Sequence, residues 1–435
     1  MCEISKVETN MELLEKVLSK ENLNLAYKQV YKNKVASGVD GVTVDELFSY
    51  IKEHKDELLD KIRNRKYKPL PVRRVYIPKE NGKLRKLGIP SVIDRVLQQA
   101  IVQVLTPIYE EQFSNNSYGF RPGRSCEMAV IKALECFNDG YDWIVDIDLQ
   151  SFFDEVNQDK LIGILRRTIK DGNLISLIRK FLQSGVMEKG VVQETKKGTP
   201  QGGNLSPLLS NIMLTELDKE LEDRGLNFVR YADDCLIMVR SKKAANRVME
   251  SITTFITKKL GLKVNVEKSK IARPNDIKYL GFGFYKKINP NIWRPKPHIK
   301  SIEKFKYKLS QILLRKRGIS LDQRLKELQY LIYGWVNYFR IADMKTLLTY
   351  IDKHIRRKMR VVIWKQWKNI KKRYTSLRKL GITHRDAYVT ANSRKGHYHI
   401  AHTRVLESAI SKERLNKRGL VNSLDHYLKV HTITN

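Results

Sequence analysis

Two apolar segments flank a pair of adjacent aspartates in the stretch FVRYADDCLIMV, Phe228–Val239. Neighbouring side chains of an extended strand point to opposite faces, so consecutive carboxylates between two such segments fit best at the tip of a β-hairpin, here Asp233 and Asp234. Carboxylates held there can bind Mg²⁺, which usually takes one or two protein carboxylates and leaves its other positions to water and phosphates. The stretch therefore predicts a nucleotidyl-transfer site, and a solvated Asp-Asp turn is the alternative.

A second acidic strand favours the first interpretation. The stretch WIVDIDL, Trp143–Leu149, alternates so that Asp146 and Asp148 share one face and Val145 and Ile147 share the other. An acidic pair on an apolar strand needs a counter-charge or a metal. Spacing alone does not say which of the two is the ligand, because both point the same way. Two-metal catalysis requires carboxylates from separate elements to converge on ions about 4 Å apart, and the two stretches supply them.

The chain as a whole resembles the group II intron reverse transcriptases and maturases. Seven blocks in family order carry the resemblance: VYIPKENGKLRKLGIP (75–90), SYGFRPGRS (117–125), DLQSFFD (148–154), GTPQGGNLSP (198–207), YADD (231–234), LKVNVEKSK (262–270) and YLGF (279–282). The resemblance covers nearly the whole length. It implies an RNA-directed DNA polymerase that uses two Mg²⁺ ions.

The resemblance also implies which residues hold the metals. In this family the metal-binding aspartate lies five residues before the aromatic residue of the Phe-Asp pair, which selects Asp148 over Asp146 and leaves Asp146 as a supporting residue. The catalytic residues are then expected to be Asp148, Asp233 and Asp234, and the metal-binding residues are expected to be these three aspartates together with Leu149.

Further residues are expected to bind the incoming nucleotide. They are Lys79, Arg85, Phe153, Gln201 and Lys268. Lys79 and Arg85 flank a predicted hairpin turn and are expected to reach the triphosphate, whereas ordinary surface charge is the alternative. The resemblance assigns Phe153 to selection of the sugar, and core packing is its alternative. Glycines after Gln201 permit close approach of a ligand, and Lys268 is expected near the departing pyrophosphate.

The charge of the chain points independently to nucleic acid. A formal net charge of +35 and a pI near 9.9 imply a polyanionic partner, because such self-repulsion is tolerated chiefly when phosphates offset it. An acidic membrane surface is the alternative, but no apolar run reaches the ~20 residues that span a bilayer, and no secretory leader opens the chain. Four cysteines without a Cys-x-x-Cys pair indicate neither a disulfide framework nor a zinc module. We therefore expect a cytoplasmic protein.

The strongest basic stretch runs from Lys353 through Leu380, with about a dozen Lys and Arg residues and no Asp or Glu. Folded RNA is bound largely through its backbone, with aromatic stacking on unpaired bases, so this stretch with Trp364, Trp367 and Tyr374 predicts an RNA surface. The expected RNA contacts are Lys353, Arg356, Arg357, Lys358, Arg360, Lys365 and Lys368. A solvated charged face is the alternative.

The expected fold is of the mixed α/β (α+β) class, a right-hand polymerase with fingers and palm. Its expected parts are a helical N-terminal extension (1–75), reverse transcriptase fingers and palm (76–300), a helical, basic thumb and maturase domain (301–375) and a C-terminal DNA-binding region (376–435). Within the first part, apolar residues recur at helical spacing over Met11–Leu18 and Val44–Ile62. Nothing after residue 380 resembles a His-Asn-His endonuclease, which suggests the compact class without that domain.

The function that the resemblance implies has two sides. The protein is expected to bind its parent group II intron RNA and assist its splicing, and to copy an RNA template from a DNA primer with dNTPs during retromobility into target DNA. No membrane partner is expected. The alternatives are an RNA-binding splicing factor with a vestigial polymerase site and a host-adopted relative in DNA repair or phage defence.

Overall fold

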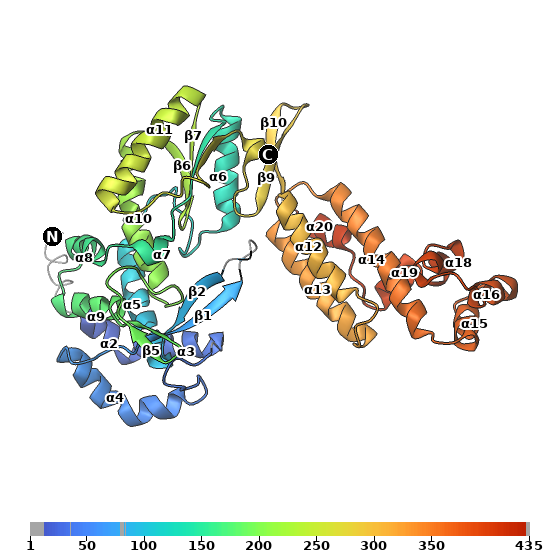
Figure 1. Ribbon diagram of the computed structural model, residues 1–435, viewed down its shortest axis with the longest axis horizontal. Helices are drawn as coiled ribbons and strands as arrows, with labels where there is room; N and C mark the ends of the chain where they lie inside the picture. Colours follow the sequence, from blue (N-terminus) through green and yellow to red (C-terminus); the bar gives the residue numbers. More distant parts are fainter. Residues whose placement is uncertain (1–12, 35, 79–81, 83, 432–435) are drawn as a thin grey trace, which may run out of the picture. The chain divides into compact units, whose positions relative to one another are not determined.

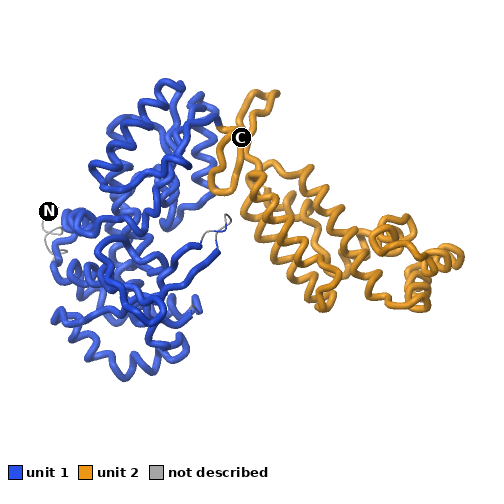
Figure 2. The backbone as a smooth tube through the Cα atoms, in the orientation of Figure 1, with its two compact units in different colours: residues 1–273 blue, residues 274–435 orange. Residues whose placement is uncertain are grey.

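The computed structural model describes residues 13–34, 36–78, 82 and 84–431, and the chain divides into two compact units, residues 1–273 and 274–435 (Figure 2). Lys79, one of the predicted nucleotide-binding residues, lies outside the described residues. None of the helices in the described ranges is long and apolar enough to cross a membrane. Each unit is a mixture of helices and strands, as the sequence predicts for the α/β class (Figure 1).

The first unit begins with helices, namely α2 (Leu13–Leu18), α3 (Lys20–Asn33) and α4 (Leu47–Arg63), and they are followed after a hairpin by α5 (Val92–Glu110). The first and third agree with the helical spacing in the sequence. Helix α3 was not among the predicted segments, although Leu23, Ala26, Tyr27 and Val30 recur at helical spacing. It is separated from α2 by Ser19, whose hydroxyl accepts a hydrogen bond from the Asn22 N–H and caps the new helix.

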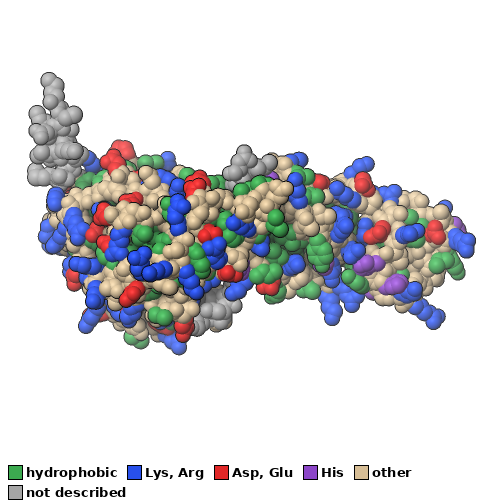
Figure 3. All heavy atoms as spheres, turned by 90° about the horizontal axis from the view of Figure 1, so that it is seen from above, with side chains coloured by type: hydrophobic (Ala, Val, Ile, Leu, Met, Phe, Trp, Pro, Cys, Tyr) green, Lys and Arg blue, Asp and Glu red, His purple; other side chains and the backbone are tan. Residues whose placement is uncertain are grey.

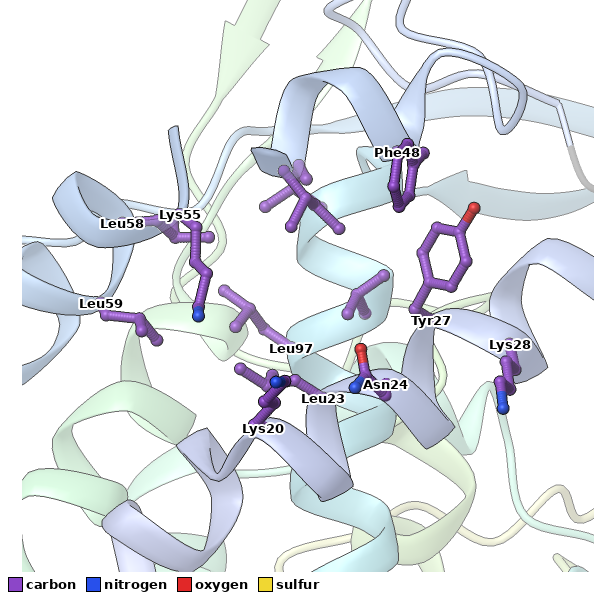
Figure 4. Close-up of a pocket in the computed structure, with 13 residues that line it drawn as sticks. Lys20, Leu23, Asn24, Tyr27, Lys28, Phe48, Lys55, Leu58, Leu59 and Leu97 are labelled. Carbon is purple, nitrogen blue, oxygen red and sulfur yellow. The ribbon is translucent and has the colours of Figure 1, made fainter. Parts of the chain in front are cut away.

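Helices α3, α4 and α5 line an apolar pocket of about 430 Å³ (Figure 4). Leu23, Phe48 and Leu97 contribute to its walls, together with the side chains of Lys20 and Lys55. No residue predicted to act in catalysis or binding lines this pocket. The pocket is therefore distinct from the site that the sequence predicts.

Two sheets organise the rest of the first unit. One has the strand order β2-β1-β4-β5, from β1 (Val72–Pro78), β2 (Leu84–Ile89), β4 (Val186–Glu188) and β5 (Val191–Gln193). The hairpin predicted around Arg85 is confirmed, since β1 and β2 pair antiparallel with Ile77 opposite Arg85. The other sheet is antiparallel and has the order β6-β7-β3-β8, from β3 (Trp143–Ile147), β6 (Asn227–Tyr231), β7 (Asp234–Val239) and β8 (Lys270–Ala272).

Helices cover the antiparallel sheet and bury its apolar residues. α6 (Cys126–Asn138) contacts β6 and β7, α10 (Ser206–Asp223) contacts β6, and α11 (Lys242–Phe255) contacts β3, β7 and β8. Val145 and Ile237 are fully buried in this core. The remaining helices of the unit are α7 (Phe152–Glu155), α8 (Gln158–Thr168), α9 (Gly172–Leu182) and a π-helical turn, η2 (Ile256–Leu260). Packing of these helices on the sheet thus determines the position of the residues at its ends.

The second unit starts with a short 3₁₀ turn, η3 (Pro274–Asp276), and an antiparallel hairpin of β9 (Phe282–Lys287) and β10 (Ile292–Pro297). The helices that follow are α12 (Ile299–Ile312), α13 (Leu321–Tyr338), α14 (Lys345–Gln366), α15 (Ile370–Lys379), α16 (His384–Ala391), α17 (His397–Ile400), α18 (Arg404–Ala409), α19 (Lys412–Lys417) and α20 (Ser423–Val430). The hairpin packs on α13, because the ring of Phe282 lies 4.8 Å from that of Phe339 and 5.8 Å from that of Tyr338. The hairpin therefore belongs to the same compact unit as the helices.

Candidate active site

The two adjacent aspartates lie at a hairpin tip, as predicted. β6 and β7 pair antiparallel up to Tyr231 and Asp234, so that only Ala232 and Asp233 form the turn between them. Ala232 has φ +57°, in the left-handed region that two-residue hairpin turns require. The turn also touches Gly119, where an added Cβ would lie 2.3 Å from the Ala232 nitrogen. A side chain at position 119 would therefore displace the turn.

A buried arginine supports this turn. Arg230 is fully buried, and its guanidinium donates hydrogen bonds to Asp218 Oδ1 and Oδ2 at 2.6 and 2.5 Å, to Asn211 Oδ1 at 3.0 Å and to the Ala232 carbonyl at 3.0 Å. Asn211 in turn donates to the Gly119 carbonyl at 2.8 Å. Arg230 and Asp218 were not predicted as members of the site, although a charged residue inside an otherwise apolar strand was a usable signal.

The second acidic strand lies beside the hairpin. β3 pairs with β7 so that Ile147 lies opposite Cys235, and continuing this register by one residue brings Asp148 opposite Asp234. Residues directly opposite share a face, as do residues two apart along a strand. Asp146, Asp148 and Asp234 are therefore on one face of the sheet, with Asp233 in the adjoining turn. Carboxylates from β3, from β7 and from the turn before β7 thus lie at one end of this sheet.

Burial and the neighbouring negative charges both raise the pKa values of these carboxyls. Loss of hydration raises the pKa of Asp234 to about 6, and the negative charges of Asp233, Asp146 and Asp148 contribute to this rise. Burial likewise raises the pKa of Asp146 to about 6 and the pKa of Asp233 above its usual value, with Asp148 adding to both. Such mutual repulsion is relieved by a bound cation, because a cation stabilises every ionised carboxylate at once.

The donor set fits Mg²⁺ in kind, since all the converging groups are carboxylates. Across the described ranges no group of three or more His, Cys, Asp and Glu side chains is already arranged as a metal site. A cation is instead supplied by the protein, because Lys268 Nζ lies 3.3 Å from Asp148 Oδ2. Binding of a metal between the aspartates therefore requires the lysine and the carboxylates to adjust.

The backbone around Asp148 explains where Leu149 and Lys268 lie. The Asn265 N–H donates to the Asp148 carbonyl at 2.8 Å and the Gln150 N–H donates to the Lys263 carbonyl at 2.8 Å, forming a bridge between Leu149 and Val264. In this pattern the carbonyl of Leu149 points away from Val264. Its side chain is buried, so only this carbonyl is suited to bind a cation. The same bridge holds the loop that carries Lys268.

Backbone hydrogen bonds also tie the sequence blocks of the first unit together. The Thr199 N–H donates to the Phe153 carbonyl at 2.7 Å, and the Gly88 N–H donates to the Gln201 carbonyl at 2.8 Å. Gly202 has φ +123°, and an added Cβ would lie 2.5 Å from the Gly88 carbonyl oxygen. This glycine is needed for the close approach of the chain to its own strand β2. Gln201 and Phe153 are thereby fixed relative to each other through the first, third and fourth blocks.

The structure also describes Arg85 and Phe153, two further residues predicted to contact the nucleotide. The positive charge of Arg85 lowers the pKa of Asp233, so the guanidinium lies within electrostatic reach of the turn. Phe153 is half-buried, and its ring lies 5.4 Å from the buried ring of Phe152. One side of Phe153 is therefore packed against the core while the other side is accessible.

Among the predicted RNA contacts, Arg360 requires a correction. Its side chain is 8% exposed, and its guanidinium donates to Glu407 Oε1 at 2.8 Å and to the Ile410 carbonyl at 3.1 Å. A guanidinium engaged inside the protein is not available to a phosphate. Trp364 is also buried, and its ring packs 5.8 Å from that of Trp367, so it serves the core and does not stack on bases. Sequence alone did not separate the inner and outer faces of α14.

The other predicted RNA contacts remain at the surface. Lys353, Arg357, Lys365 and Lys368 are exposed, and Arg356 and Lys358 are half-buried. Lys358 Nζ lies 5.4 Å from the ring centre of Tyr398, and Lys365 Nζ donates to the Arg315 carbonyl at 3.3 Å. Figure 3 shows Lys and Arg side chains over the visible face of both units, with fewer Asp and Glu among them. The basic charge of the chain is thus carried on its surface.

Comparisons with known proteins match both units. The family model for "Reverse transcriptase (RNA-dependent DNA polymerase)" matches residues 77–284, and the model for "Group II intron, maturase-specific domain" matches residues 302–381. Protein YkfC of Escherichia coli (strain K12) is 35% identical over 277 residues, which are 55% of this chain and 73% of YkfC. The two models and this relative confirm the resemblance that the sequence blocks indicate.

Other relatives are longer than this chain. Group II intron-encoded protein LtrA of Lactococcus lactis subsp. cremoris is 32% identical over 324 residues, which are 59% of this chain and 54% of LtrA. The putative COX1/OXI3 intron 2 protein of Saccharomyces cerevisiae is 29% identical over 68% of this chain and 41% of its own length. The match therefore spans about half of these two proteins. A solved chain of the "Partial Cas6-RT-Cas1--Cas2 complex" matches 57% of this chain and 43% of its own length at 25% identity, with a TM-score of 0.37 that is too low to bear on the fold.

Proposed function

Because the chain belongs to the group II intron reverse transcriptases and maturases, with one domain of each kind, we propose that it copies RNA into DNA at Asp148, Asp233 and Asp234. The observation that carries the proposal is the convergence of these aspartates at one end of the β6-β7-β3-β8 sheet. Asp148 and Asp234 share one face of this sheet, and Asp233 lies in the turn beside them, which supports the assignment.

Asp148, Asp233, Asp234 and the carbonyl of Leu149 would hold two Mg²⁺ ions. When bound, the ions would activate the attacking primer 3′-hydroxyl and neutralise the charge of the leaving pyrophosphate. Arg85 extends a positive charge from β2 towards the triphosphate of the dNTP. Lys268 starts from its ion pair with Asp148 and offsets the charge of the pyrophosphate as it departs.

In this proposal, Phe153 and Gln201 select the nucleotide. Both are held in place by the backbone hydrogen bonds that connect the sequence blocks. The accessible side of Phe153 faces the sugar and leaves no room for a 2′-hydroxyl, while its packed side keeps the ring in place. Gln201 is held in the same framework, since its carbonyl accepts a hydrogen bond from the Gly88 N–H, and its side chain is only partly covered. In the proposal it contacts the nucleotide and the templating base. Lys79, which follows β1 in the sequence, is the remaining member of the proposed set.

In the proposed right-hand architecture, residues 1–75 form the N-terminal extension, 76–300 the fingers and palm, 301–375 the thumb and maturase domain, and 376–435 a C-terminal DNA-binding region. The maturase side of the proposal is that the chain binds its parent group II intron RNA and assists its splicing. The phosphate contacts come from the exposed or half-buried cations Lys353, Arg356, Arg357, Lys358, Lys365 and Lys368. Copying of the intron into target DNA during retromobility follows from combining the two activities.

The test of the polymerase is extension of a DNA primer annealed to an RNA template with dNTPs. We expect extension with Mg²⁺ and none when EDTA removes it. The test of the maturase is self-splicing of the RNA that flanks the gene, with and without the protein, at a salt concentration where the RNA alone splices slowly. Failure to extend any primer in Mg²⁺ would contradict the proposed polymerase activity. A splicing rate that the protein does not change would contradict the proposed maturase activity.

A further inference from the structure

The hairpin of β9 and β10 has two faces of different character. Phe282, Phe284, Trp293 and Pro295 alternate along the strands and are buried. The residues between them lie on the other face, where Arg294 pairs across the ladder with Tyr285, while Lys287 and Lys296 lie further along the same face. Three cations and a tyrosine therefore share one surface of a short sheet.

This surface meets the start of α14. The Asp343 N–H donates to the Pro295 carbonyl at 2.9 Å, which joins the helix start to β10. The Asp343 carboxylate accepts hydrogen bonds from Arg294 Nε at 2.8 Å and from the Tyr285 hydroxyl at 2.6 Å. The only acid lining this surface is thus neutralised by Arg294 within the described residues, and the charges of Lys287 and Lys296 are left to face the solvent.

Between the hairpin and the helix lies a pocket of about 820 Å³. Its lining includes Lys287, Lys296, Lys345 and Thr346, with His431 from the end of the chain behind them. Lys296 Nζ lies 5.7 Å from the ring centre of Tyr285, so one cation is already oriented along the wall. A pocket of this size accommodates a nucleotide unit, and its charge selects an anion.

The start of α14 adds a second source of positive potential. No side chain caps this helix, and its first turn contains no acidic residue. Its first residue is instead Lys345, an exposed lysine at the positive end of the helix dipole. A cation at this position is unfavourable for the helix unless an anion binds there. Lys345 therefore costs some helix stability in the free protein.

We propose that this pocket binds a phosphate group of a polynucleotide strand, held by Lys287, Lys296, Lys345 and the first backbone N–H groups of α14. The inference rests on the proposed nucleic-acid function and adds a contact at the β9-β10 hairpin and the first turn of α14, apart from the predicted RNA contacts, which begin at Lys353 further along that helix. The phosphate is either an internal phosphodiester or a 5′-terminal phosphate, since both present the same oxygens to the lysines.

The experiment measures the affinity of the full-length protein for RNA as a function of salt. In the variant Lys287→Gln/Lys296→Gln/Lys345→Gln we expect a loss of affinity of about 10-fold, and a log K versus log salt slope that is shallower by about 0.7 to 0.9 for each phosphate released. The matched control is Lys242→Gln/Lys243→Gln/Lys258→Gln, which removes the same charge from exposed lysines of α11 and the turn after it. If the pocket variant and the control variant lose RNA affinity equally, the pocket does not bind a phosphate specifically, and the loss reflects only the lower net charge.

The single variant Lys345→Gln separates binding from folding. We expect its thermal unfolding midpoint to be equal to or above that of the parent, because the unfavourable charge at the helix start is gone, while its RNA affinity falls. Unchanged affinity and slope in both pocket variants would refute the proposal. Comparing 5′-phosphorylated with 5′-hydroxyl RNA identifies the source, since only a terminal-phosphate site makes the parent prefer the former. The binding readout does not require polymerisation, so failure of primer extension does not affect it.

Discussion

Arg230 and Asp218 form an ion pair that is fully shielded from solvent, directly before the turn that carries Asp233. Arg230 Nη2 lies 2.5 Å from Asp218 Oδ2, and both side chains are 0% exposed. The same guanidinium donates to the Ala232 carbonyl at 3.0 Å. A charged pair taken wholly out of water is retained at a considerable desolvation cost, and here the pair connects helix α10 to the geometry of the hairpin tip.

Breaking this pair should destabilise the protein and misplace the turn. We expect Asp218→Asn to lower the free energy of unfolding by about 3–5 kcal/mol, because it leaves the arginine buried without its counter-charge. The double variant Arg230→Met/Asp218→Leu should recover much of that stability. It should remain poor in primer extension, since nothing then donates to the Ala232 carbonyl. Urea unfolding and extension rates measure the two effects, and a double variant as active as the parent would limit Arg230 to a role in folding.

Removing a single metal-binding carboxylate should abolish polymerisation and spare binding. We expect Asp148→Asn and Asp233→Asn each to lower primer extension by several orders of magnitude, because the ions that position the reacting oxygens are then held by one carboxylate fewer. Intron-RNA affinity and the unfolding midpoint should stay close to those of the parent. Asp223→Asn, at an exposed position at the end of α10, is the matched control. Extension within about tenfold of the parent would contradict the assignment.

The sugar preference should depend on one aromatic ring. Phe153→Ala removes the accessible side of a ring whose other side packs on Phe152, and so opens space beside the metal site. We expect kcat/KM for ribonucleotides to rise relative to that for dNTPs, with the fold retained because Phe153 is only half-buried. Phe152→Leu, a change in the buried neighbour, serves as the control for altered packing. If the ratio of kcat/KM for ribonucleotides to that for dNTPs does not change, Phe153 serves only in core packing.

The two faces of α14 should respond differently to the removal of a positive charge. Replacing the exposed Lys353 and Arg357 of α14, together with the exposed Lys368 just after the helix, with Gln should weaken intron-RNA binding and splicing more than extension of a short annealed primer. The log K versus log salt slope should become shallower by about 0.7 to 0.9 for each phosphate that the variant no longer binds.

Arg360→Ala should instead destabilise the second unit by about 1–3 kcal/mol, since the Ile410 carbonyl is deprived of its donor and Glu407 of its partner. Its RNA affinity per folded molecule should stay unchanged. Unfolding by urea and RNA titration in the same buffer measure both quantities. If the Arg360 variant is as stable as the parent but binds RNA weakly, Arg360 contacts RNA after all.

A buried carboxyl outside the site should make stability depend on pH. Asp94 is 1% exposed, and burial raises its pKa to about 6, although it accepts hydrogen bonds from the Tyr67 and Ser91 hydroxyls at 2.6 and 2.8 Å. Its folded-state pKa lies above the ordinary value of 3.8, so its contribution to stability is complete below about pH 4 and is lost as the pH rises through 6.

We therefore expect the stability of the parent relative to Asp94→Asn to fall by about 2–3 kcal/mol between pH 4 and pH 7. Any constant cost of the amide affects every pH equally and leaves this slope intact. Urea unfolding of both proteins across the range gives the difference. A difference that does not change with pH would show that Asp94 keeps an ordinary pKa in the folded protein.

Local patterns in the sequence were sufficient for the β6-β7 hairpin, the shared face of Asp146 and Asp148, and the hairpin of β1 and β2. Each depends on alternation along one strand or on a short turn, and these are set by residues adjacent in the chain. The sequence blocks likewise identified the family, because their order is a property of the chain alone. Helix α3 was missed although Leu23, Ala26, Tyr27 and Val30 recur at helical spacing, so the sequence did carry a usable signal for it.

What the tertiary structure decided was which charged residues face solvent and which face the protein. Arg357 and Arg360 lie on the same basic helix, yet only packing against Glu407 and Ile410 takes Arg360 out of reach of RNA. Arg230 joined the site because Asp218, twelve residues earlier, folds back beneath it. The opposition of Asp148 and Asp234 also required the strand register. A charge buried or exposed by distant segments leaves no local pattern, since its burial depends on residues that the chain brings near only when it folds.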